Sequence, residues 1–249
     1  MFSYIFMKIL EKRPERYNMG INILSGGHAE KIRKQIVHTY VEPGMEILDI
    51  GCGTGSLLID AAKAGANATG LDISKGMLAV AQKGIANNGV KDRITLHNAG
   101  VVEIDSLFEE NSFDLIISTL VFSELYSEEK ALALHQIKKL LKPDGTLVIA
   151  VEVQPRKPLK KIIHFIVRFP LTVLTYIIAQ TGTKPFARIS EEITESGFNI
   201  TSEDRSFLDS FIIISAKKPS DNRPDKIVLP GTKKPEDDFR PHSTHVRSL

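Results

Sequence analysis

The sequence predicts an α/β fold: a doubly wound, mostly parallel sheet of seven strands with an N-terminal helical cap and an apolar helical insertion. Three observations predict it. Short apolar runs alternate with helical patterns between Met45 and Glu152, a glycine-rich turn follows the first apolar run, and two more apolar runs lie near residues 198–216. Strands that alternate with helices indicate a parallel sheet with helices on both faces. A chain of 249 residues is long enough to bury one sizeable core.

The first forty residues predict a helical cap. Residues 2–16 and 28–40 have helical spacing and bracket a turn-rich stretch, and Ile32 and Ile36 share one face of the second helix. The opening residues lack the basic leader and small-residue cleavage site of a signal peptide. We therefore expect them to form a helix of the mature protein, with the cap covering residues 1–40.

The main domain is expected over residues 41–216. Its predicted strands and helices follow in the order strand 46–50, helix 56–63, strand 68–72, helix 75–87, strand 94–97, strand 113–118, helix 128–141 and strand 146–152. After a break, a helix over 188–196 ends at Gly197, and strands near 198–205 and 210–216 close the domain. The short connection between these last two strands predicts an antiparallel strand at the edge of the sheet.

Composition and charge narrow the function classes. Cys52 is the single cysteine, so no intrachain disulfide can form and a reducing cytoplasm fits. The formal charge is +2, but residues 217–249 carry eight Lys/Arg against five Asp/Glu, which leaves the body about neutral. The basic field of a nucleic-acid-binding protein is therefore not expected. The same segment has five prolines and few large apolar residues, which predicts a disordered tail over 217–249.

The turn Gly51-Cys52-Gly53-Thr54-Gly55 is the most informative segment. Its glycines allow a tight turn and a close approach of a ligand to the main chain. The helix that follows presents N–H groups and a partial positive charge to an anionic group. A dinucleotide-binding turn would have a third glycine at position 56, where this chain has Ser56. A bare structural turn remains an alternative.

Asp72 is the second candidate binding residue. It ends the second strand, 21 residues beyond Gly51, where an acid can accept hydrogen bonds from both ribose hydroxyls. NAD enzymes use the same position, so Asp72 favours a nucleoside without selecting one. The structural alternative is that Asp72 caps the helix beginning near Lys75, for which Ser74 is an equally good candidate.

Two segments of the sequence resemble motifs of a known enzyme class. Residues 47–55 resemble motif I of class I S-adenosylmethionine-dependent methyltransferases, and residues 140–147 resemble the segment that leads into their fifth strand. The resemblance covers about residues 15–216 and implies a Rossmann-like sheet with S-adenosyl-L-methionine as the cofactor. The implied cofactor-binding residues are Asp49 and the turn Gly51, Cys52, Gly53 and Gly55 for the methionine end, Asp72 for the ribose, Ile73 for one face of the adenine, and Gly100, Val101 and Ser118 along the neighbouring strand ends.

The chain departs from this pattern at Gly100. Many relatives have an aspartate after the third strand whose side chain meets the adenine amino group, and Gly100 takes its place here. The adenine would then rely on the main chain of Val101 and on Asn98. We expect weaker cofactor affinity and the same reaction.

Within the class, the sequence is most similar to the corrinoid-associated methyltransferases, which are relatives of the quinone C-methyltransferases. Four segments carry this similarity: residues 3–8, 14–17, 122–125 and 168–171. The similarity implies a methyl acceptor that is a small molecule, a lipophilic ring or a corrinoid-linked group, with a corrinoid protein as a partner in the last case.

The residues after the fourth strand should face the transferred methyl group, because ligands of doubly wound sheets lie beyond the carboxyl ends of the strands. There Glu124 is the candidate catalytic base or orienting group. Alternatively, Ser123 or Ser127 caps the next helix and Glu124 is solvated in its first turn. Tyr17 is a second candidate, which either closes over the cofactor or simply packs. The seven histidines have no ligand spacing, so no metal site is predicted.

The apolar insertion spans residues 153–187. Residues 162–179 approach transmembrane length, but Arg168 and Pro170 argue against a membrane-spanning helix. The stretch 159–179 starts as a basic amphipathic helix, which indicates a substrate lid or an anchor at a membrane surface. The alternative is a helical pair that covers the acceptor pocket and packs on the cap. We thus expect a cytoplasmic methyltransferase, or one bound peripherally to a membrane. The rival hypotheses are an NAD(P)-dependent oxidoreductase and a non-catalytic, membrane-associated cofactor-binding protein.

Overall fold

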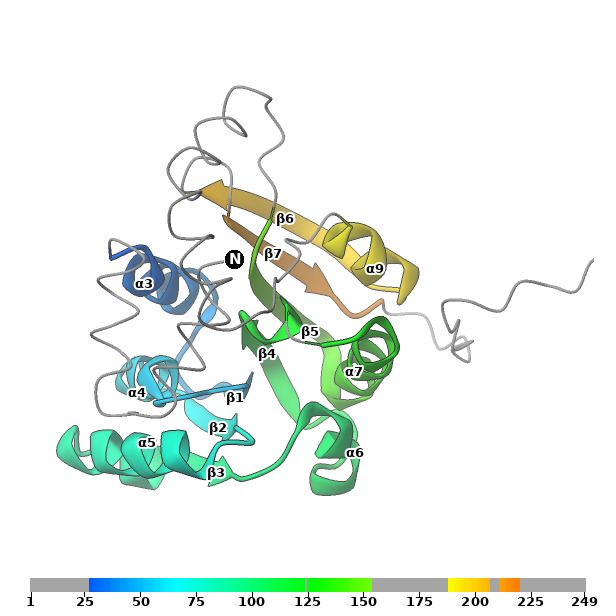
Figure 1. Cartoon of the computed structure of the whole chain (residues 1–249). Coiled ribbons are helices and arrows are strands. Elements are labelled where there is room, and N and C mark those ends of the chain that lie inside the picture. The colour runs from blue at the N-terminus through cyan, green and yellow to red at the C-terminus, as the bar shows by residue number, and fades with distance from the viewer. Residues whose placement is uncertain (1–26, 124, 154–187, 207–210, 220–249) are drawn as a thin grey trace, which may run out of the picture.

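The computed structural model describes residues 27–123, 125–153, 188–206 and 211–219 (Figure 1). The helices of these ranges are α3 (His28–Tyr40), α4 (Ser56–Lys63), α5 (Lys75–Asn87), α6 (Ile104–Leu107), α7 (Ser127–Leu140) and α9 (Ile189–Glu195), with short 3₁₀ turns at Lys91–Arg93, Val101–Glu103 and Val121–Ser123. The strands are β1 (Glu46–Ile50), β2 (Asn67–Leu71), β3 (Ile94–His97), β4 (Phe113–Thr119), β5 (Leu141–Glu152), β6 (Asn199–Ser206) and β7 (Phe211–Lys217).

The strands form one seven-stranded sheet in the order β3-β2-β1-β4-β5-β7-β6. Strands β1 to β5 pair in parallel, and β7 runs antiparallel to both β5 and β6. The predicted fold class is confirmed, including the antiparallel strand, although that strand lies between β5 and β6. The strand order reverses between β1 and β4, which is where ligands bind in doubly wound sheets.

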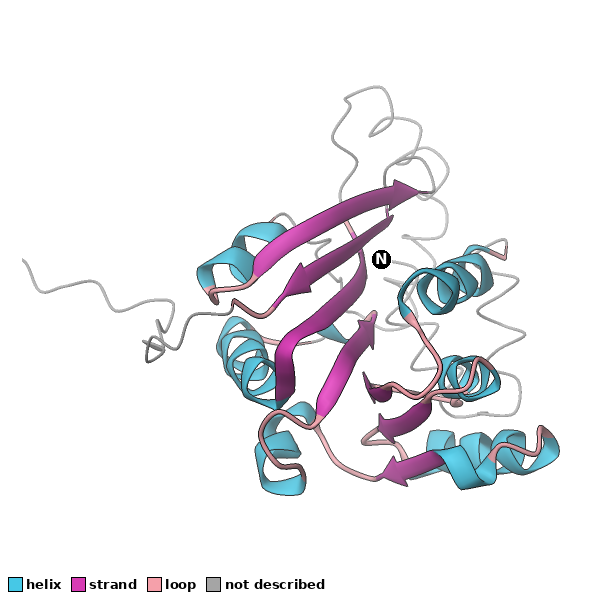
Figure 2. Cartoon of the chain, turned by 180° about the vertical axis from the view of Figure 1, so that it is seen from behind, coloured by secondary structure: helices cyan, strands magenta, loops and turns pink. Residues whose placement is uncertain are grey.

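Helices cover both faces of the sheet (Figures 1 and 2). Alternate residues of each buried strand enter opposite layers, since successive side chains of a strand point to opposite faces. In β1, Ile47 packs with Ile36 of α3 and Leu57 of α4, whereas Leu48 packs in the layer that holds Ile137 of α7. Helix α3, which the sequence analysis assigns to the cap, thus contributes to the core of the sheet.

Apart from shifts of one residue at several element ends, three predicted boundaries differ from the structure. Strand β5 begins at Leu141, and the predicted turn Lys142–Gly145 lies inside it as an irregularity, with Asp144 in the left-handed region at φ 63°. Val153 belongs to the core rather than to the insertion. Lys217 ends β7, and the Lys218 ammonium donates to the Leu141 carbonyl at 2.7 Å, so the predicted tail cannot begin at 217. The rest of the insertion and of the tail, and the cap before residue 27, lie outside the described residues.

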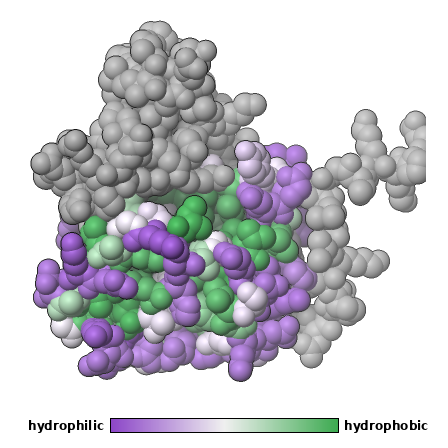
Figure 3. Space-filling view, turned by 60° about the horizontal axis from the view of Figure 1, so that its bottom comes forward, coloured by the Kyte–Doolittle hydropathy of each residue, from purple (hydrophilic) through white to green (hydrophobic). Residues whose placement is uncertain are grey.

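None of the helices that the structure describes combines the length and apolar composition that crossing a bilayer requires. Hydrophobic residues reach the surface among hydrophilic ones on the face shown in Figure 3. Over the described ranges, the large hydrophobic side chains that are exposed are Ile73, Val102, Leu107 and Tyr126. Ile73 lies two residues beyond the end of β2 and is 73% exposed, which matters for the site.

Candidate cofactor site

The glycine-rich turn leaves β1 at the carboxyl edge of the sheet and enters α4. The N–H groups of Gly51 and Cys52 both donate to the carbonyl of Leu71, each at 2.8 Å, so the turn is tied to the end of β2. Gly51, Gly53 and Gly55 all have positive φ angles, of 76°, 54° and 73°. Side chains disfavour this region, which explains why glycine occupies all three positions.

The three glycines differ in what surrounds them. A Cβ at Gly51 would stand 2.0 Å from Cγ2 of Val121, and one at Gly55 would stand 3.0 Å from Cβ of Ala81. A Cβ at Gly53 would meet no described atom within 4 Å. Gly51 and Gly55 are therefore required for packing, whereas Gly53 borders open space that a ligand can occupy.

The Cys52 side chain points away from this space. The residue is 8% exposed and belongs to a small core cluster with Leu58, Ala68 and Leu78. Burial, with the nearby charges of Asp49 and Asp72, raises the pKa of the Cys52 thiol, which therefore stays protonated. Only the main chain of Cys52 is available to the cofactor, so the predicted binding role is restricted to its backbone.

Asp49 is a buried acid one residue before the end of β1. Its side chain is 3% exposed, and burial together with the charge of Asp72 raises its pKa from 3.8 to about 7. Within the described residues, no donor group forms a hydrogen bond with its carboxylate. A buried carboxylate of this kind favours a cationic ligand, because a nearby positive charge offsets the cost of burying the negative one.

Asp72 links the tips of β1 and β2. One carboxylate oxygen accepts a hydrogen bond from the N–H of Gly53 at 2.8 Å, and the other accepts from the N–H of Ser74 at 2.8 Å. Ser74, and not Asp72, is the N-cap of α5, since its hydroxyl accepts from the N–H of Met77 at 3.3 Å. A carboxylate oxygen can accept more than one hydrogen bond, so these two contacts are compatible with a ribose hydroxyl at Asp72.

The expected role of Asn98 differs from what the structure shows. Its side-chain amide donates to the carbonyls of Asp72 and Ile73, at 2.9 and 3.0 Å. Asn98 thus holds the end of β2 in place and does not present its amide to an adenine. Gly100 lies against Ile73, since a Cβ at Gly100 would be 3.4 Å from Cγ2 of Ile73, and Val101 beside it is buried.

The structure brings the end of β4 to the same edge of the sheet. Ser118 is fully buried, and its hydroxyl donates to the carbonyl of Ile50 at 3.3 Å, so this side chain joins β4 to β1. Leu120 adopts φ 68°, a conformation that is costly for a leucine and is often found at functional sites. The Leu120 carbonyl accepts hydrogen bonds from both the N–H and the hydroxyl of Ser123, which stabilise this turn.

The two candidate catalytic residues, Glu124 and Tyr17, lie outside the described residues. The predicted serine caps are wrong: Tyr126 is the N-cap of α7, and its N–H donates to the Glu129 carboxylate at 2.8 Å. Ser123 instead bonds to Leu120.

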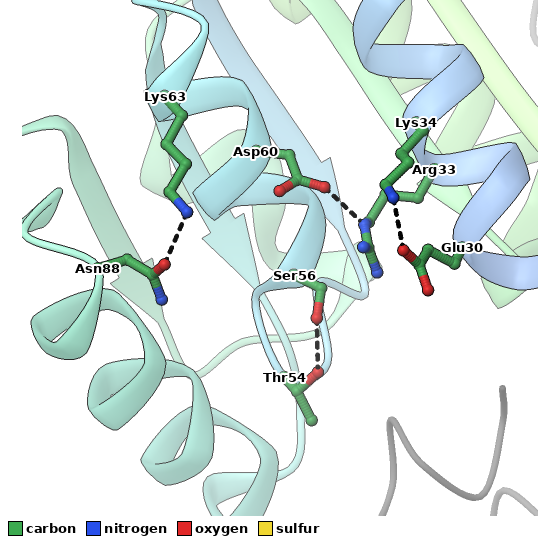
Figure 4. A network of polar contacts seen from close by, with 8 residues as sticks. All are labelled: Glu30, Arg33, Lys34, Thr54, Ser56, Asp60, Lys63 and Asn88. Atoms are coloured by element: carbon green, nitrogen blue, oxygen red, sulfur yellow. Dashed lines mark hydrogen bonds and ion pairs between the residues drawn. The ribbon is translucent and has the colours of Figure 1, made fainter.

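Polar contacts on either side of α4 hold the helix that begins at the glycine turn (Figure 4). Arg33 of α3 donates to Asp60 at 2.7 Å, and Lys63 donates to Asn88 beyond α5 at 2.7 Å. The hydroxyls of Thr54 and Ser56 lie 3.4 Å apart at the start of the helix. These contacts fix α4 relative to its neighbours, and with it the turn.

Sequence reasoning missed two residues of the site. Val121 packs on Gly51, and Glu103 accepts a hydrogen bond from the N–H of Gly100 at 2.7 Å. The spacing of Glu103 three residues after Gly100 is that of a capping box, which is a signal readable from sequence. No comparable signal identifies Val121. Across the described part of the chain, no group of three or more His, Cys, Asp or Glu side chains is placed to hold a metal ion.

The described residues fit S-adenosylmethionine. Three features follow one another along the carboxyl edge of β1 and β2. They are the open space beside Gly53, the carboxylate of Asp72 and the exposed apolar side chain of Ile73. These features match an amino-acid tail, a ribose and a flat apolar base. Asp49 lies buried beside them, with an environment that favours a cation.

Comparisons with known proteins identify the family of the chain. Residues 41–165 match the family model described as "Methyltransferase domain", which is half of the chain. The chain is 32% identical over 162 residues to the demethylmenaquinone methyltransferase of Symbiobacterium thermophilum, covering 64% of this chain and 62% of that protein. It is 35% identical over 149 residues to the enzyme of the same name from Lactiplantibacillus plantarum, covering 58% and 61%. The chain thus spans about three fifths of the length of these relatives.

Among solved structures, the fold is similar to magnesium protoporphyrin IX methyltransferase from Synechocystis PCC 6803, which was solved with bound S-adenosylhomocysteine. The TM-score is 0.58 at 22% identity, over 81% of this chain and 87% of that one. This likeness concerns the fold, whereas the family match runs through the glycine turn, Asp72 and the ends of β3 and β4. The chain therefore belongs to the methyltransferase-domain family, as a class I member whose cofactor is S-adenosylmethionine.

Proposed function

We propose that this protein transfers the methyl group of S-adenosylmethionine to a carbon of a small lipophilic ring, of the kind represented by a demethylated quinone. The observation that carries the proposal is the sequence identity of 32% over 162 residues and of 35% over 149 residues to two demethylmenaquinone methyltransferases. The apolar sequence of residues 159–179 supports a lipophilic acceptor.

The protein mainly has to position the two reactants for this reaction. The sulfonium carbon is already activated, so an acceptor carbon attacks the methyl group in line, the bond from carbon to sulfur breaks, and S-adenosylhomocysteine remains. The acceptor carbon then loses a proton to a base, for which Glu124 is our candidate. Asp49 and Asp72 orient the cofactor, and the turn at Leu120 lies at the end of β4, where the acceptor would approach.

The test is methyl transfer from labelled S-adenosylmethionine to a soluble demethylated naphthoquinol, followed by chromatography of the extracted lipid fraction. We expect label in the naphthoquinone product with the intact chain, and about tenfold less label with Asp72→Asn when S-adenosylmethionine is below saturation. If the label enters only a corrinoid bound to protein, the quinone proposal is wrong and the acceptor is corrinoid-linked. Normal binding of S-adenosylhomocysteine with no transfer to any fraction of a host lysate would favour a non-catalytic cofactor-binding protein.

The same assay tests the insertion. We propose that residues 159–179 cover the acceptor, either as a lid or while resting on a membrane surface. Deletion of residues 158–180 should abolish transfer to the naphthoquinol and leave S-adenosylhomocysteine binding measurable by isothermal titration. Loss of both together would mean that the segment is part of the folding core. Co-sedimentation of the intact chain with anionic vesicles, lost on deletion, would place the insertion at a membrane surface.

A further inference from the structure

A carboxylate stands where the chain lacks the acid expected at Gly100. Gly100 has an extended backbone, with φ −92° and ψ 171°, and its N–H donates to Oε2 of Glu103 at 2.7 Å. A Cβ built on Gly100 would lie 3.6 Å from that same oxygen and 3.4 Å from Cγ2 of Ile73. The Glu103 side chain therefore folds back to lie beside the place where a side chain at position 100 would begin, near Ile73.

The segments that carry these residues are held together at one edge of the sheet. β2 and β3 pair in parallel up to Leu71 and His97, and the N–H of Asp72 donates to the carbonyl of His97 at 3.2 Å. Asn98 adds two hydrogen bonds from β3 to the main chain of residues 72 and 73. The acid for the ribose, the apolar side chain of Ile73 and the Glu103 carboxylate thus follow in one direction away from β1.

The surface of Ile73 is suited to a flat ring. The side chain is 73% exposed, so a flat ring could rest on it. A purine resting on Ile73 would have Gly100 and the Glu103 carboxylate at its edge. Gly100 leaves room there, because the residue itself has no side chain.

The carboxylate has the capacity for a second bond. Its two oxygens offer about four acceptor sites, and the N–H of Gly100 uses one of them. Adenine presents an amino group, a donor, at the edge of its six-membered ring. Hypoxanthine presents a carbonyl oxygen at the same place, which a carboxylate repels. A carboxylate at this position therefore distinguishes the two bases.

We infer that Glu103 selects the adenine base of the cofactor by accepting a hydrogen bond from the exocyclic amino group. The inference deepens the proposed function, since it rests on a nucleoside lying across the ends of β1 and β2. It also replaces our expectation that the base relies on Asn98 and on main-chain groups alone.

The test compares S-adenosylhomocysteine with its deaminated analogue, S-inosylhomocysteine, by isothermal titration of the full chain. The measured quantity is the ratio of the two dissociation constants. In Glu103→Gln the side-chain carbonyl still accepts from Gly100, but the amide nitrogen replaces the other oxygen and can donate to the hypoxanthine carbonyl. We expect the preference for the adenosine ligand to fall by about tenfold or more, the range of a hydrogen bond to a charged group, and Glu103→Ala to reduce the preference as well.

Asp105→Asn is the matched control, because it removes an exposed acid two residues away. It should leave the ratio unchanged. If both Glu103 variants weaken the two ligands equally, Glu103 only caps the turn and the inference is wrong. An equal change in Asp105→Asn would show a non-specific charge effect and would also overturn it. If the unaltered chain binds neither ligand, the cofactor assignment fails together with the inference, which separates this result from the other two.

Discussion

Asp49 carries the clearest electrostatic signal of any single residue in the site. Burial and the neighbouring Asp72 raise its pKa to about 7, so near neutral pH the side chain is shared between its neutral and charged forms. The α-ammonium of the cofactor's methionine end would favour the charged form. Binding should therefore be coupled to the loss of a proton from Asp49.

This coupling predicts the pH dependence of cofactor affinity. Below pH 7, binding the cation requires deprotonation of Asp49, so affinity should rise with pH, by up to about tenfold per pH unit, and level off above 7. Asp49→Asn should bind more weakly at pH 7.5 and show little slope. Dissociation constants for S-adenosylhomocysteine between pH 5.5 and 8 check this. An equal slope in both proteins would contradict the role of Asp49.

The stability of the folded protein should depend on pH in the opposite direction, because of the same side chain. Because the pKa in the folded protein lies above the ordinary value of 3.8, the folded state binds the extra proton between about pH 4 and 7. The contribution of Asp49 to the free energy of unfolding is therefore fully present below about pH 4 and is lost progressively as the pH rises from 4 to about 7. Binding and stability thus respond to pH in opposite directions, which separates the two effects.

The glycines allow a second test at single residues. Gly53→Ala places a methyl group in the open space before the turn and puts alanine at φ 54°, at a cost of about 1–2 kcal/mol. Gly89→Ala is the matched control, since Gly89 has φ 67° and equally open surroundings at the end of α5. We expect similar losses in melting temperature, with cofactor affinity reduced only by Gly53→Ala. Equal affinity in both variants would mean that the ligand does not approach Gly53.

The sequence predicted the acids Asp49 and Asp72 and the glycine turn, because each lies at the end of a strand in a recognisable local pattern. It could not predict which way a side chain points. Cys52 and Ser118 are in the expected places, yet the first faces a core cluster and the second bonds to β1. Such orientations depend on neighbours distant in sequence, as when Ser118 meets Ile50 from 68 residues away.

At the scale of elements, the site depends on how firmly the ends of neighbouring strands are joined. The tip of β2 is bonded to the glycine turn through Leu71 and Asp72, and to β3 through Asn98. The helices are fixed in turn, α4 by contacts with α3 and with Asn88 (Figure 4). The carboxyl edge is therefore a preformed surface rather than a set of independent loops.

Removal of the Asn98 amide tests this view. Asn98→Ala loses two hydrogen bonds to the carbonyls of Asp72 and Ile73, so the ribose and adenine positions should loosen. We expect cofactor affinity to fall by about fivefold or more, the range of one or two net hydrogen bonds. Thr194→Ala removes a side-chain hydrogen bond to the Ser190 carbonyl within α9, away from these strand ends, and should leave affinity unchanged. The titration is accompanied by thermal melts, because equal loss of affinity in both variants would indicate a general loosening.

The elements themselves followed from local patterns. Helices α4 and α5 begin and end at the predicted residues, because glycine or serine at the start and the loss of apolar spacing at the end are both local signals. The start of β5 was missed, since Leu141 joins the sheet only by pairing with Phe113. The cap of α7 was missed because Glu129 satisfies the N–H of Tyr126 without a capping serine.

At the scale of the molecule, the order of the strands explains where the site lies. β7 lies between β5 and β6 on the side of the sheet away from β3, and the strand order reverses between β1 and β4, where ligands bind in doubly wound sheets. The alternation of strands and helices predicts this architecture, but strand order is set by pairings between distant segments. The sequence contains no residue pattern that identifies the methyl acceptor.

The central claim is that a nucleoside cofactor lies across the ends of β1 and β2. Isothermal titration of the full chain with S-adenosylhomocysteine, alongside NADH and the Asp72→Asn variant, tests it most directly. We expect one binding site for S-adenosylhomocysteine, no heat from NADH, and affinity lower by about tenfold or more in Asp72→Asn, since its hydrogen bonds are made by a charged group. Unchanged affinity in a folded Asp72→Asn protein, or tighter binding of NADH, would contradict the account.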